Sequence, residues 1–514
     1  MSKTIIIIGA GLAGLSAALQ AAENGCNVKL VSSLPSERAQ SVMAEGGINA
    51  ALNTKDENDS PEEHFTDTIK AACGLADPNA VWGMTQAAPE LVHWLLKLGV
   101  KFNMSGYDDV DLRNFGGQKK KRTAFAQSDT GKQIMTAMID AVRRKEASGM
   151  VERFSHHSFL TLRLCGNICC GCVIRDEYSQ ETVELPGDAV IVATGGMHGL
   201  FGNTTGSLSN TGEVTAELFR LGVPLANGEM IQYHPTTVKC GGKRMLISEA
   251  ARGEGGRLFA MKDGKQWYFM EEKYPELGNL MPRDITAREI WKVSHESEVF
   301  LDMTEISEEI ISNKLSGLAD DCMTYLHKDI RKEPVSVLPG IHYFMGGILV
   351  DEQHRTPIQN LYAAGECCAQ YHGANRLGGN SLLGALYGGR VAAESACEQA
   401  DVVDLSCATQ IDFPPASQIS EIKQLNKVMQ ETMGVVRNEN TLLNGIQTVQ
   451  ALTGNLPLLG MAVLKSALAR KESRGAHWRE DYPKSNDDDY LKTTVARFDG
   501  KQIQISFVPV PERR

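Results

Sequence analysis

Five short segments of this chain carry side chains that can bind an anion or move a proton. Together they contain two histidines, a serine, a glutamate and three arginines: His234, Ser248, Glu249, Arg252, Arg283, His342 and Arg376. An arginine is a permanent cation whose planar N–H donors match a carboxylate. Taken singly, each histidine could equally be a hydrogen-bonded core residue, and each arginine could form an interdomain ion pair. The chemistry therefore depends on whether the fold brings these segments together.

The spacing of Glu249 and Arg252 gives one local expectation. Residues three apart share a face if their segment is helical, and such a pair could pass a proton along that face. The glycines that follow in SEAARGEGG (248–256) leave the local conformation open.

The N-terminal segment 4–32 is expected to fold as a strand, a glycine-rich turn, a helix and a second strand. Gly9 permits the turn, Gly11 lets the backbone approach a pyrophosphate, and Gly14 allows close packing of helix on strand. The helix N-terminus then faces the phosphates with free N–H groups. The acidic residue that usually ends the second strand is absent. Ser32-Ser33 stands there, so a hydroxyl would bind the ribose, which weakens the case for NAD.

Two later segments favour FAD. DAVIVATGG (188–196) and IQNLYAAGE (358–366) are expected to be buried strands, ending at Thr194-Gly195 and at Glu366. Either alone would be an ordinary core strand, but with the N-terminal fingerprint they resemble the FAD-binding fold of flavoprotein oxidoreductases. The resemblance implies that Glu366 bonds ribityl or ribose hydroxyls. It also implies that a helix starting near Ser381 and Leu382 directs its positive end at the flavin.

Seven ordered motifs carry a more specific resemblance. They are AEGGINAAL, QYHPT, SEAARGEGG, MPRD, HYFMGG, AAGE and HGANRLGGNSL, in an order that runs through the chain from Ser2 to about Pro509. The order is similar to that of succinate dehydrogenase and fumarate reductase flavoprotein subunits, and L-aspartate oxidases share most of it. The resemblance implies an α/β FAD-binding, Rossmann-like domain split over 1–228 and 342–400. An α+β capping domain (229–341) and a C-terminal helical domain (401–514) would complete the chain.

The same resemblance implies the site roles of a flavin-dependent oxidoreductase acting on CH–CH bonds. Hydride would pass from flavin N5 to fumarate while Arg283 supplies the proton, recharged through Glu249 and Arg252. Free guanidinium hardly deprotonates near neutral pH, so this acid would lose its proton only in the transition state. The substrate carboxylates would be held by His234, Ser248, His342 and Arg376.

Phe115, in NFGG (114–117), bears on the substrate. L-aspartate oxidases resemble this chain but carry a glutamate there, which meets the substrate ammonium. A phenylalanine can attract a cation only through its ring face. This favours fumarate or succinate, with L-aspartate and another enoate acid as the alternatives. Phe115 could also be a core aromatic, which would leave the choice open.

The loop ERAQSVMAEGGINAAL (37–52) bears on how the flavin is held. In the resembling family this loop lies against the flavin, with Ser41 near it and Gly46-Gly47 allowing close approach. Many members carry a histidine five residues before the residue that precedes the double glycine, and this histidine bonds covalently to the flavin. Here that position is Gln40, so non-covalent FAD is expected. The lower potential of such a flavin would favour fumarate reduction over succinate oxidation.

The remaining features concern partners and location. A net charge of −11 argues against broad nucleic-acid binding. No run of about 18 apolar residues could span a membrane, so we expect a cytoplasmic chain, or one held peripherally on the inner face of the membrane through partner subunits. Cys165, Cys169, Cys170 and Cys172 favour a hairpin with buried thiols over a metal site. Since no cluster spacing occurs, electrons would come from an iron–sulfur subunit, a flavin carrier or a nicotinamide.

Overall fold

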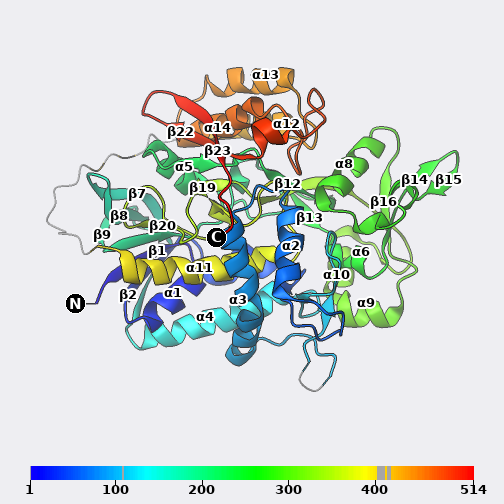
Figure 1. The fold of residues 1–514 in the computed structure, drawn as a ribbon, viewed down its shortest axis with the longest axis horizontal. Helices are drawn as coiled ribbons and strands as arrows, with labels where there is room; N and C mark the ends of the chain where they lie inside the picture. Colours follow the sequence, from blue (N-terminus) through cyan, green and yellow to red (C-terminus); the bar gives the residue numbers. More distant parts are fainter. Residues whose placement is uncertain (1, 107–108, 402–410, 412, 414–417) are drawn as a thin grey trace.

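A five-stranded parallel sheet forms the centre of the protein. The computed structural model describes residues 2–106, 109–401, 411, 413 and 418–514 (Figure 1). The strand order is β20-β10-β1-β2-β6, with bounds β1 (Thr4–Ile8), β2 (Asn27–Ser32), β6 (Val151–Ser155), β10 (Ala189–Val192) and β20 (Leu361–Ala363). Their isoleucine and valine side chains are buried on both faces, as a covered parallel sheet requires. The predicted α/β Rossmann-like fold is confirmed.

Helices cover one face of this sheet. They are α1 (Leu12–Glu23), α4 (Thr130–Ala147) and α11 (Asn380–Gln399); α3 (Pro78–Leu98) packs on α4 and α11, and α2 (Pro61–Ala71) packs beside α3. The closest pair is α1 and α11, where the Ser16 hydroxyl donates to the Leu386 carbonyl at 2.7 Å. A Cβ at Gly389 would lie 2.2 Å from the Ala13 carbonyl oxygen. Only a glycine lets these two helices pack so closely.

The cysteine-rich segment is a hairpin on the other face, as predicted. β7 (His157–Cys165) and β8 (Ile168–Asp176) pair antiparallel, and β9 (Thr182–Pro186) adds a third strand. Cys169 and Cys172 are buried in the core beneath the central sheet, whereas Cys165, expected among the buried thiols, is only half-buried. Burial raises the pKa of both thiols above the ordinary value, as expected of structural cysteines.

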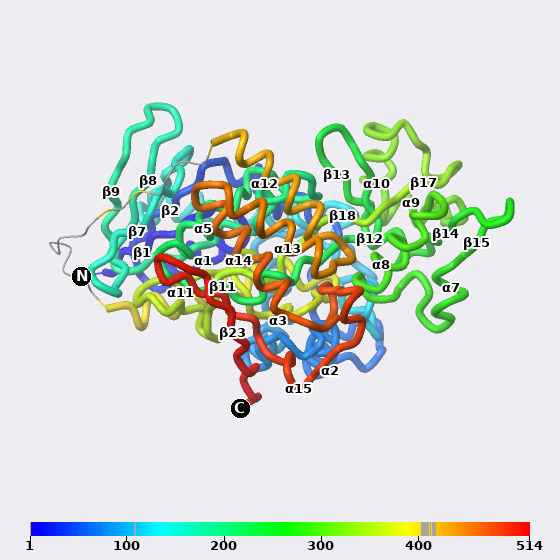
Figure 2. The backbone as a smooth tube through the Cα atoms, turned by 90° about the horizontal axis from the view of Figure 1, so that it is seen from above, coloured from blue at the N-terminus to red at the C-terminus, as the bar shows by residue number. Residues whose placement is uncertain are grey.

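A second unit of mixed helices and strands lies at one end of the molecule, green in Figures 1 and 2. One sheet joins β12 (Ile231–Cys240), β13 (Lys243–Leu246) and β18 (Leu338–Phe344), and the other joins β14 (Arg257–Lys262), β15 (Lys265–Trp267), β16 (Val299–Asp302) and β17 (Val335–Ser336). Its helices are α6 (Glu249–Gly253), α7 (Phe269–Lys273), α8 (Arg283–Val293), α9 (Glu308–Lys314) and α10 (Ser316–Asp321). The predicted domain boundary at residue 341 falls inside β18, and the boundaries of the predicted capping domain stay a prediction.

The C-terminal part is helical only at first. α12 (Ile419–Thr432), α13 (Glu439–Val449) and α14 (Asn455–Ala469) pack together, and the short α15 (Asp487–Tyr490) follows. The chain then forms a hairpin of β22 (Lys492–Phe498) and β23 (Ile503–Pro509). Much of the predicted start of this domain, at 402–410, 412 and 414–417, lies outside the described residues.

That hairpin is a difference from the purely helical domain expected. β22 pairs with β11 (Leu225–Ala226), which also pairs with β19 (Gly347–Leu349), and β21 (Cys368–Ala369) completes the sheet. β-Branched and aromatic residues in TTVARF and ISFVP favour strands. The C-terminus therefore extends a sheet of the Rossmann-like part.

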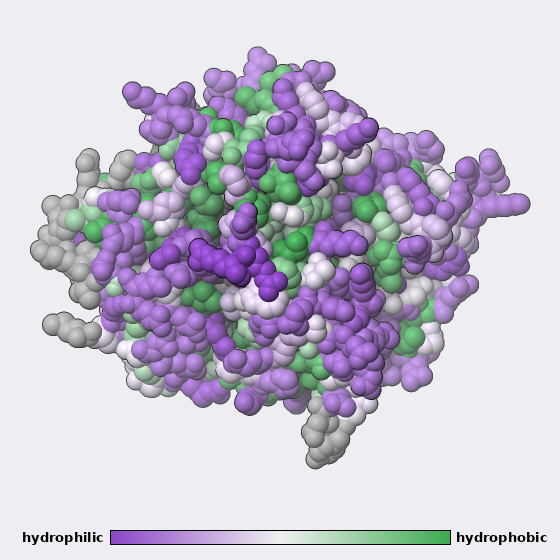
Figure 3. Space-filling model, in the orientation of Figure 1, coloured by the Kyte–Doolittle hydropathy of each residue, from purple (hydrophilic) through white to green (hydrophobic). Residues whose placement is uncertain are grey.

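A small sheet of β3 (Ile48–Asn49), β5 (Thr123–Ala124) and β4 (Leu112–Arg113) holds the loop after Gly46-Gly47 in place. The face seen in Figure 3 is mostly hydrophilic, with scattered apolar patches. In the described ranges, every helix is too short or too polar to cross a lipid bilayer.

Candidate active site

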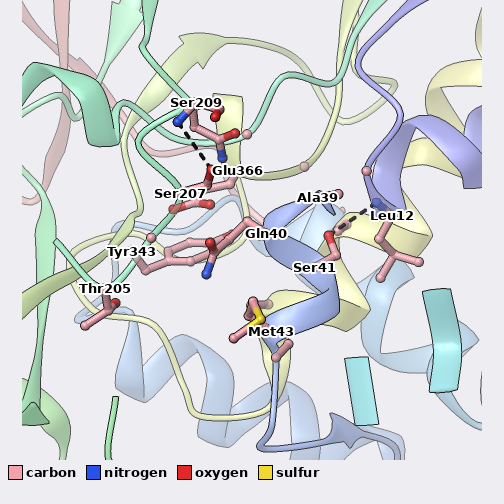
Figure 4. A pocket seen from close by; sticks show the side chains of 18 of the residues that line it. Leu12, Ala39, Gln40, Ser41, Met43, Thr205, Ser207, Ser209, Tyr343 and Glu366 are labelled. Atoms are coloured by element: carbon pink, nitrogen blue, oxygen red, sulfur yellow. Dashed lines mark hydrogen bonds between the residues drawn. The ribbon is translucent and has the colours of Figure 1, made fainter. Parts of the chain in front are cut away.

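A cavity of about 760 Å³ runs between the Rossmann-like part and the second unit. Of the side chains and glycines predicted to form the site, all line this cavity except Gly14 and Arg252. Figure 4 shows Ser41 and Leu12 on one side and Thr205 and Tyr343 on the other. The fold therefore brings together segments that lie hundreds of residues apart in the sequence.

The fingerprint glycines have separate uses. Gly9 has a φ of +111°, and a Cβ there would lie 2.2 Å from the Ala193 carbonyl oxygen. A Cβ at Gly14 would lie 1.8 Å from the Gly9 carbonyl oxygen, so Gly14 serves packing behind the cavity wall. A Cβ at Gly11 would meet nothing nearer than the Ser41 hydroxyl, at 3.7 Å. The backbone at Gly11 is thus open to a ligand.

Polar groups around this half of the cavity are ready to bind one. The Ser41 hydroxyl accepts the Leu12 N–H at 3.3 Å, at the start of α1. The Ser32 hydroxyl is buried and has no hydrogen-bond partner among the described residues. Thr194 and Gly195 follow β10, and Gly195 takes a φ of +74° against the Asn210 side chain. The Glu366 carboxylate accepts the Phe344 N–H at 3.1 Å.

The N-terminus of α11 forms the next section of the wall. Gly379 precedes the helix with a φ of +84° and offers no capping side chain, while Ser381 and Leu382 line the cavity. Asn49 holds this turn from behind, donating from its side chain to the Gly378 carbonyl at 2.7 Å and from its N–H to the Gly379 carbonyl at 3.1 Å. Two helix N-termini, an unpartnered hydroxyl and an open glycine turn along one elongated cavity fit a dinucleotide such as FAD.

The other half of the cavity contains the predicted proton relay. Glu249 lies between two arginines, accepting from Arg283 Nε at 2.8 Å and Nη2 at 2.5 Å, and from Arg252 Nη2 at 3.2 Å. It also accepts the Gly116 N–H at 3.2 Å. Burial raises the pKa of Glu249, but the guanidiniums of Arg283 and Arg252 outweigh it and hold the pKa below the ordinary value. This carboxylate is therefore ionised and bridges the two arginines.

Local structure explains this arrangement. Ser248 caps α6 by accepting the Ala250 N–H, so Glu249 and Arg252 do share one helical face. Arg283 is the first residue of α8, directly after Pro282, which suits a helix start. Glu249 and Arg283 are therefore the first residues of α6 and α8, and their side chains are in direct contact.

The predicted carboxylate-binding residues surround the relay. Arg376 stacks over the Tyr343 ring at 4.3 Å, and its buried Nε has no partner among the described residues. Burial and the nearby Arg283 lower its pKa to about 9. The rings of His234 and His342 lie 5.1 Å apart, and burial together with Arg283 holds both pKa values well below the ordinary one. This end of the cavity is therefore electropositive.

Phe115 lies in the wall at this end and is also buried. A Cβ at Gly46 would lie 3.0 Å from its ring, and one at Gly378 equally close. The ring thus packs on Gly46 and on Gly378, and it belongs to an apolar cluster of the second unit. Phe115 is therefore a buried core aromatic that also lines the cavity, and its role toward a substrate stays a prediction.

Three further residues are missing from the sequence prediction. Gln232 accepts from Arg283 Nη1 at 3.1 Å and donates to the Arg376 carbonyl at 2.8 Å; its presence in the QYHPT motif is the signal. Thr205 contacts His342. Glu45 is a cavity-lining carboxyl whose pKa is raised to about 8 by burial and by Asp321. In the described part of the chain, no group of three or more His, Cys, Asp or Glu side chains could hold a metal ion.

Two protein families match the sequence: the FAD binding domain over residues 4–382 and the fumarate reductase flavoprotein C-term over residues 452–513. The succinate dehydrogenase flavoprotein subunit of Bacillus subtilis is 38% identical, over 100% of this chain and 98% of its own. The 8-methylmenaquinol:fumarate reductase flavoprotein subunit of Wolinella succinogenes is 32% identical, over 100% and 92%. Among solved structures, a variant of FrdA from the E. coli quinol fumarate reductase superposes with a TM-score of 0.89 at 27% identity, covering 99% and 97% of the two chains.

Proposed function

Since the chain belongs to the FAD-dependent family of succinate dehydrogenase and fumarate reductase flavoprotein subunits, oxidoreductases that act on CH–CH bonds, we propose that it reduces fumarate to succinate. The observation that supports this proposal is the buried Arg283–Glu249–Arg252 chain beside the unpartnered Arg376, in one cavity with the glycine turn. Bound FAD would supply the hydride. The residues of the chain supply the anion site and the proton.

The anion site consists of His234, Ser248, His342 and Arg376. Arg376 offers a guanidinium edge to one carboxylate, and the histidines and the serine hold the other end of the substrate. Cations fixed in a site that excludes water polarise the bound carboxylate more than solvated ones would. Holding both ends of a planar enoate also orients its double bond, which removes much of the entropic barrier.

Arg283 is the proton donor in this proposal. Its Nε and Nη2 contact Glu249 Oε2, and Glu249 Oε1 contacts Arg252 Nη2. As a hydride reaches one substrate carbon, Arg283 releases a proton to the other, and the product is succinate. Glu249, which is ionised at rest, then takes up a proton through Arg252 and passes it on to Arg283. The hydride and the proton together balance the two-electron reduction.

Phe115 favours fumarate over L-aspartate. An amino acid substrate brings an ammonium group that needs an acceptor, and the Phe115 ring packs between Gly46 and Gly378 instead of offering one. Replacement by glutamate is the change that would introduce that acceptor.

Gln40 supports non-covalent FAD and the reductive direction. It lines the cavity at the position where covalent relatives are expected to carry the linking histidine, and a carboxamide cannot form that bond. Similarity does not set the direction, because relatives carry both names. Acid precipitation tests the linkage: yellow colour in the supernatant is expected, and colour retained in the pellet would contradict it.

Electrons must come from outside the chain in this proposal. Relatives are named as subunits, so an iron–sulfur partner is our first candidate, and another electron carrier is the alternative. Such a partner would also place the chain at the inner face of a membrane. Copurification followed by iron analysis distinguishes these donors.

Anaerobic reoxidation tests the reaction itself. The purified protein is reduced until the flavin absorbance is bleached and is then mixed with fumarate, with oxaloacetate plus ammonium, or with other enoate acids. Rapid recolouring by fumarate with formation of succinate is expected. A flavin that stays bleached with fumarate but recolours with another acceptor would replace the substrate assignment.

A further inference from the structure

Thr205 contacts the imidazole of His342 from the loop that precedes α5 (Glu213–Arg220). Its hydroxyl oxygen lies 2.8 Å from His342 Nδ1 and 3.4 Å from the Ile341 carbonyl oxygen. That carbonyl already accepts the Thr205 backbone N–H at 3.0 Å. The shorter contact indicates that the hydroxyl donates to Nδ1. Thr205 lines the cavity beside Tyr343 (Figure 4).

His342 is a neutral imidazole in this environment. The His234 ring lies 5.1 Å away, and burial, followed by the guanidiniums of Arg283 and Arg376, holds the pKa of His342 well below the ordinary value. A neutral imidazole has one N–H, and the hydrogen bond at one nitrogen decides whether the other carries it. If Nδ1 accepts a proton from Thr205, Nε2 must carry the hydrogen.

His234, on the neighbouring strand, is held differently. Its Nδ1 lies 3.1 Å from the Thr236 carbonyl oxygen, which can only accept, and 3.3 Å from the Thr236 nitrogen, while its buried Nε2 has no partner in the described part of the structure. The Thr236 hydroxyl donates instead to the Ile247 carbonyl at 2.9 Å. Backbone groups therefore hold Nδ1 of His234, whereas a side-chain hydroxyl holds Nδ1 of His342.

We propose that Thr205 is a positioning residue that fixes His342 with Nε2–H directed to a substrate carboxylate. This inference rests on the proposed function, since it names how one of the carboxylate-binding residues is made a donor. Without the hydroxyl, neutral His342 can place its hydrogen on Nδ1 and present a lone pair to the anion. Thr205 shares its loop with the cavity-lining Ser207 and Asn210. In this proposal, the same loop borders the nucleotide half of the cavity and orients a histidine of the substrate half.

Three variants of the FAD-loaded protein test this role. Thr205→Val removes the hydroxyl and keeps the shape, Thr205→Ser keeps the hydroxyl, and Thr205→Ala removes both. The probe is malonate, a saturated dicarboxylate, titrated by the perturbation of the flavin absorbance. A hydrogen bond to a charged group is worth about 1.5–3 kcal/mol, so the malonate Kd should rise about 10- to 100-fold in Thr205→Val. Thr205→Ser should restore most of the affinity, and the KM for fumarate should change more than kcat.

The pH profile separates this role from a merely structural one. A bound dicarboxylate raises the pKa of His342, and a His342 that is protonated in the complex has N–H groups at both nitrogens, so it no longer needs Thr205 to choose between them. The ratio of the Thr205→Val Kd to the wild-type Kd should therefore fall toward one as the pH is lowered from about 8 to about 5.5. A ratio that stays constant with pH, or a Thr205→Ser variant as weak as Thr205→Val, would overturn the proposal.

A measurement on the wild-type protein keeps the test independent of folding. In protein labelled with ¹⁵N-histidine, the His342 signals are assigned by their loss in His342→Gln. Nδ1 should have the shift of an unprotonated nitrogen and Nε2 that of a protonated one; the reverse would overturn the inference. If wild-type protein binds no dicarboxylate while this tautomer is found, the proposed function fails and the Thr205 contact stands.

Discussion

Two groups of buried arginines in this protein differ in what surrounds them. At the interface with the C-terminal part, Arg470 is fully buried and bonds Glu229, Glu472 and Thr494 together with backbone carbonyls, each between 2.7 and 3.2 Å. At the cavity, Arg376 is nearly as buried but has only the Tyr343 ring and an unpartnered Nε among the described residues. Burying a guanidinium is costly in both places, yet only at the interface does the protein itself supply the acceptors.

We propose that this difference separates a structural arginine from one that binds a ligand. Burial, together with the neighbouring Arg283, lowers the pKa of Arg376 to about 9. His477, also buried at the interface, accepts from Arg437 at 2.9 Å, although Arg437 Nη2 has no partner among the described residues. An unmet donor beside a cavity is therefore a better indication of function than a buried charge.

The largest effect is expected from Arg283→Gln. The variant loses the proton donor and leaves Glu249 paired with Arg252 alone. General-acid catalysis is typically worth about 10²–10⁴-fold, so kcat for fumarate should fall by about 10³-fold or more. The measurement is anaerobic turnover with a reduced dye at matched flavin content.

Arg288→Gln is the matched control, because Arg288 lies on the same helix but stacks on Trp478. It should keep most of the activity. Turnover of Arg283→Gln within tenfold of the wild type would remove Arg283 from the acid role.

Arg470→Met tests the satisfied group. It would leave the buried carboxylates of Glu229 and Glu472 short of a cation, and breaking a buried pair in this way costs about 3–5 kcal/mol. The free energy of unfolding in urea should fall by that amount, while kcat per folded protein stays close to the wild-type value. Arg331→Met, at an exposed ion pair with Glu308, should cost about 1 kcal/mol or less. Equal losses of unfolding free energy in the two variants would show that the buried ion pairs of Arg470 stabilise the protein no more than an exposed pair does.

Arg376→Met should have the opposite effect on stability. It removes a buried charge that lacks an acceptor, so the ligand-free protein should be as stable as the wild type or slightly more stable. Malonate at about 100 times its Kd should stabilise the wild type by about 2.7 kcal/mol and the variant hardly at all. Thermal unfolding with and without malonate measures both. A variant destabilised like Arg470→Met would mean that Arg376 is structural.

Much of the fold and site could be predicted because local patterns determine them. Gly9, Gly11 and Gly14 lie within six residues, and steric exclusion at Gly9 and Gly14 limits the backbone to one kind of turn. The Glu249–Arg252 pair follows from helical spacing alone. Residues within such motifs therefore lie in the cavity wall or directly behind it.

Long-range partners could not be predicted in this way. The strand pattern of β22 is visible in the sequence, but its pairing with β11 joins Ala496 to Leu225 across the chain, and nothing local selects that partner. Thr205 lies in a loop without periodicity, and its use depends on where β18 places His342. Helical spacing predicts the Glu249–Arg252 pair, whereas no spacing in the sequence points to Thr205.

The smallest expected effect is a change in acid sensitivity through His477. Its Nδ1 accepts from Arg437 at 2.9 Å, its Nε2 lies 3.2 Å from the Arg470 carbonyl oxygen, and burial with these arginines holds its pKa well below the ordinary value. The unfolded chain therefore binds a proton below about pH 6.5 that the folded protein does not, so this stability is full above that pH and lost as the pH falls. His477→Gln should reduce the slope of unfolding free energy between about pH 6 and 5 by about 1.4 kcal/mol per pH unit.

At the cavity, bound malonate should instead raise the pKa of His234 and His342 and flatten a separate part of that slope. The two effects should add, because the groups do not share partners; a His477→Gln slope equal to the wild type would mean that acid acts elsewhere.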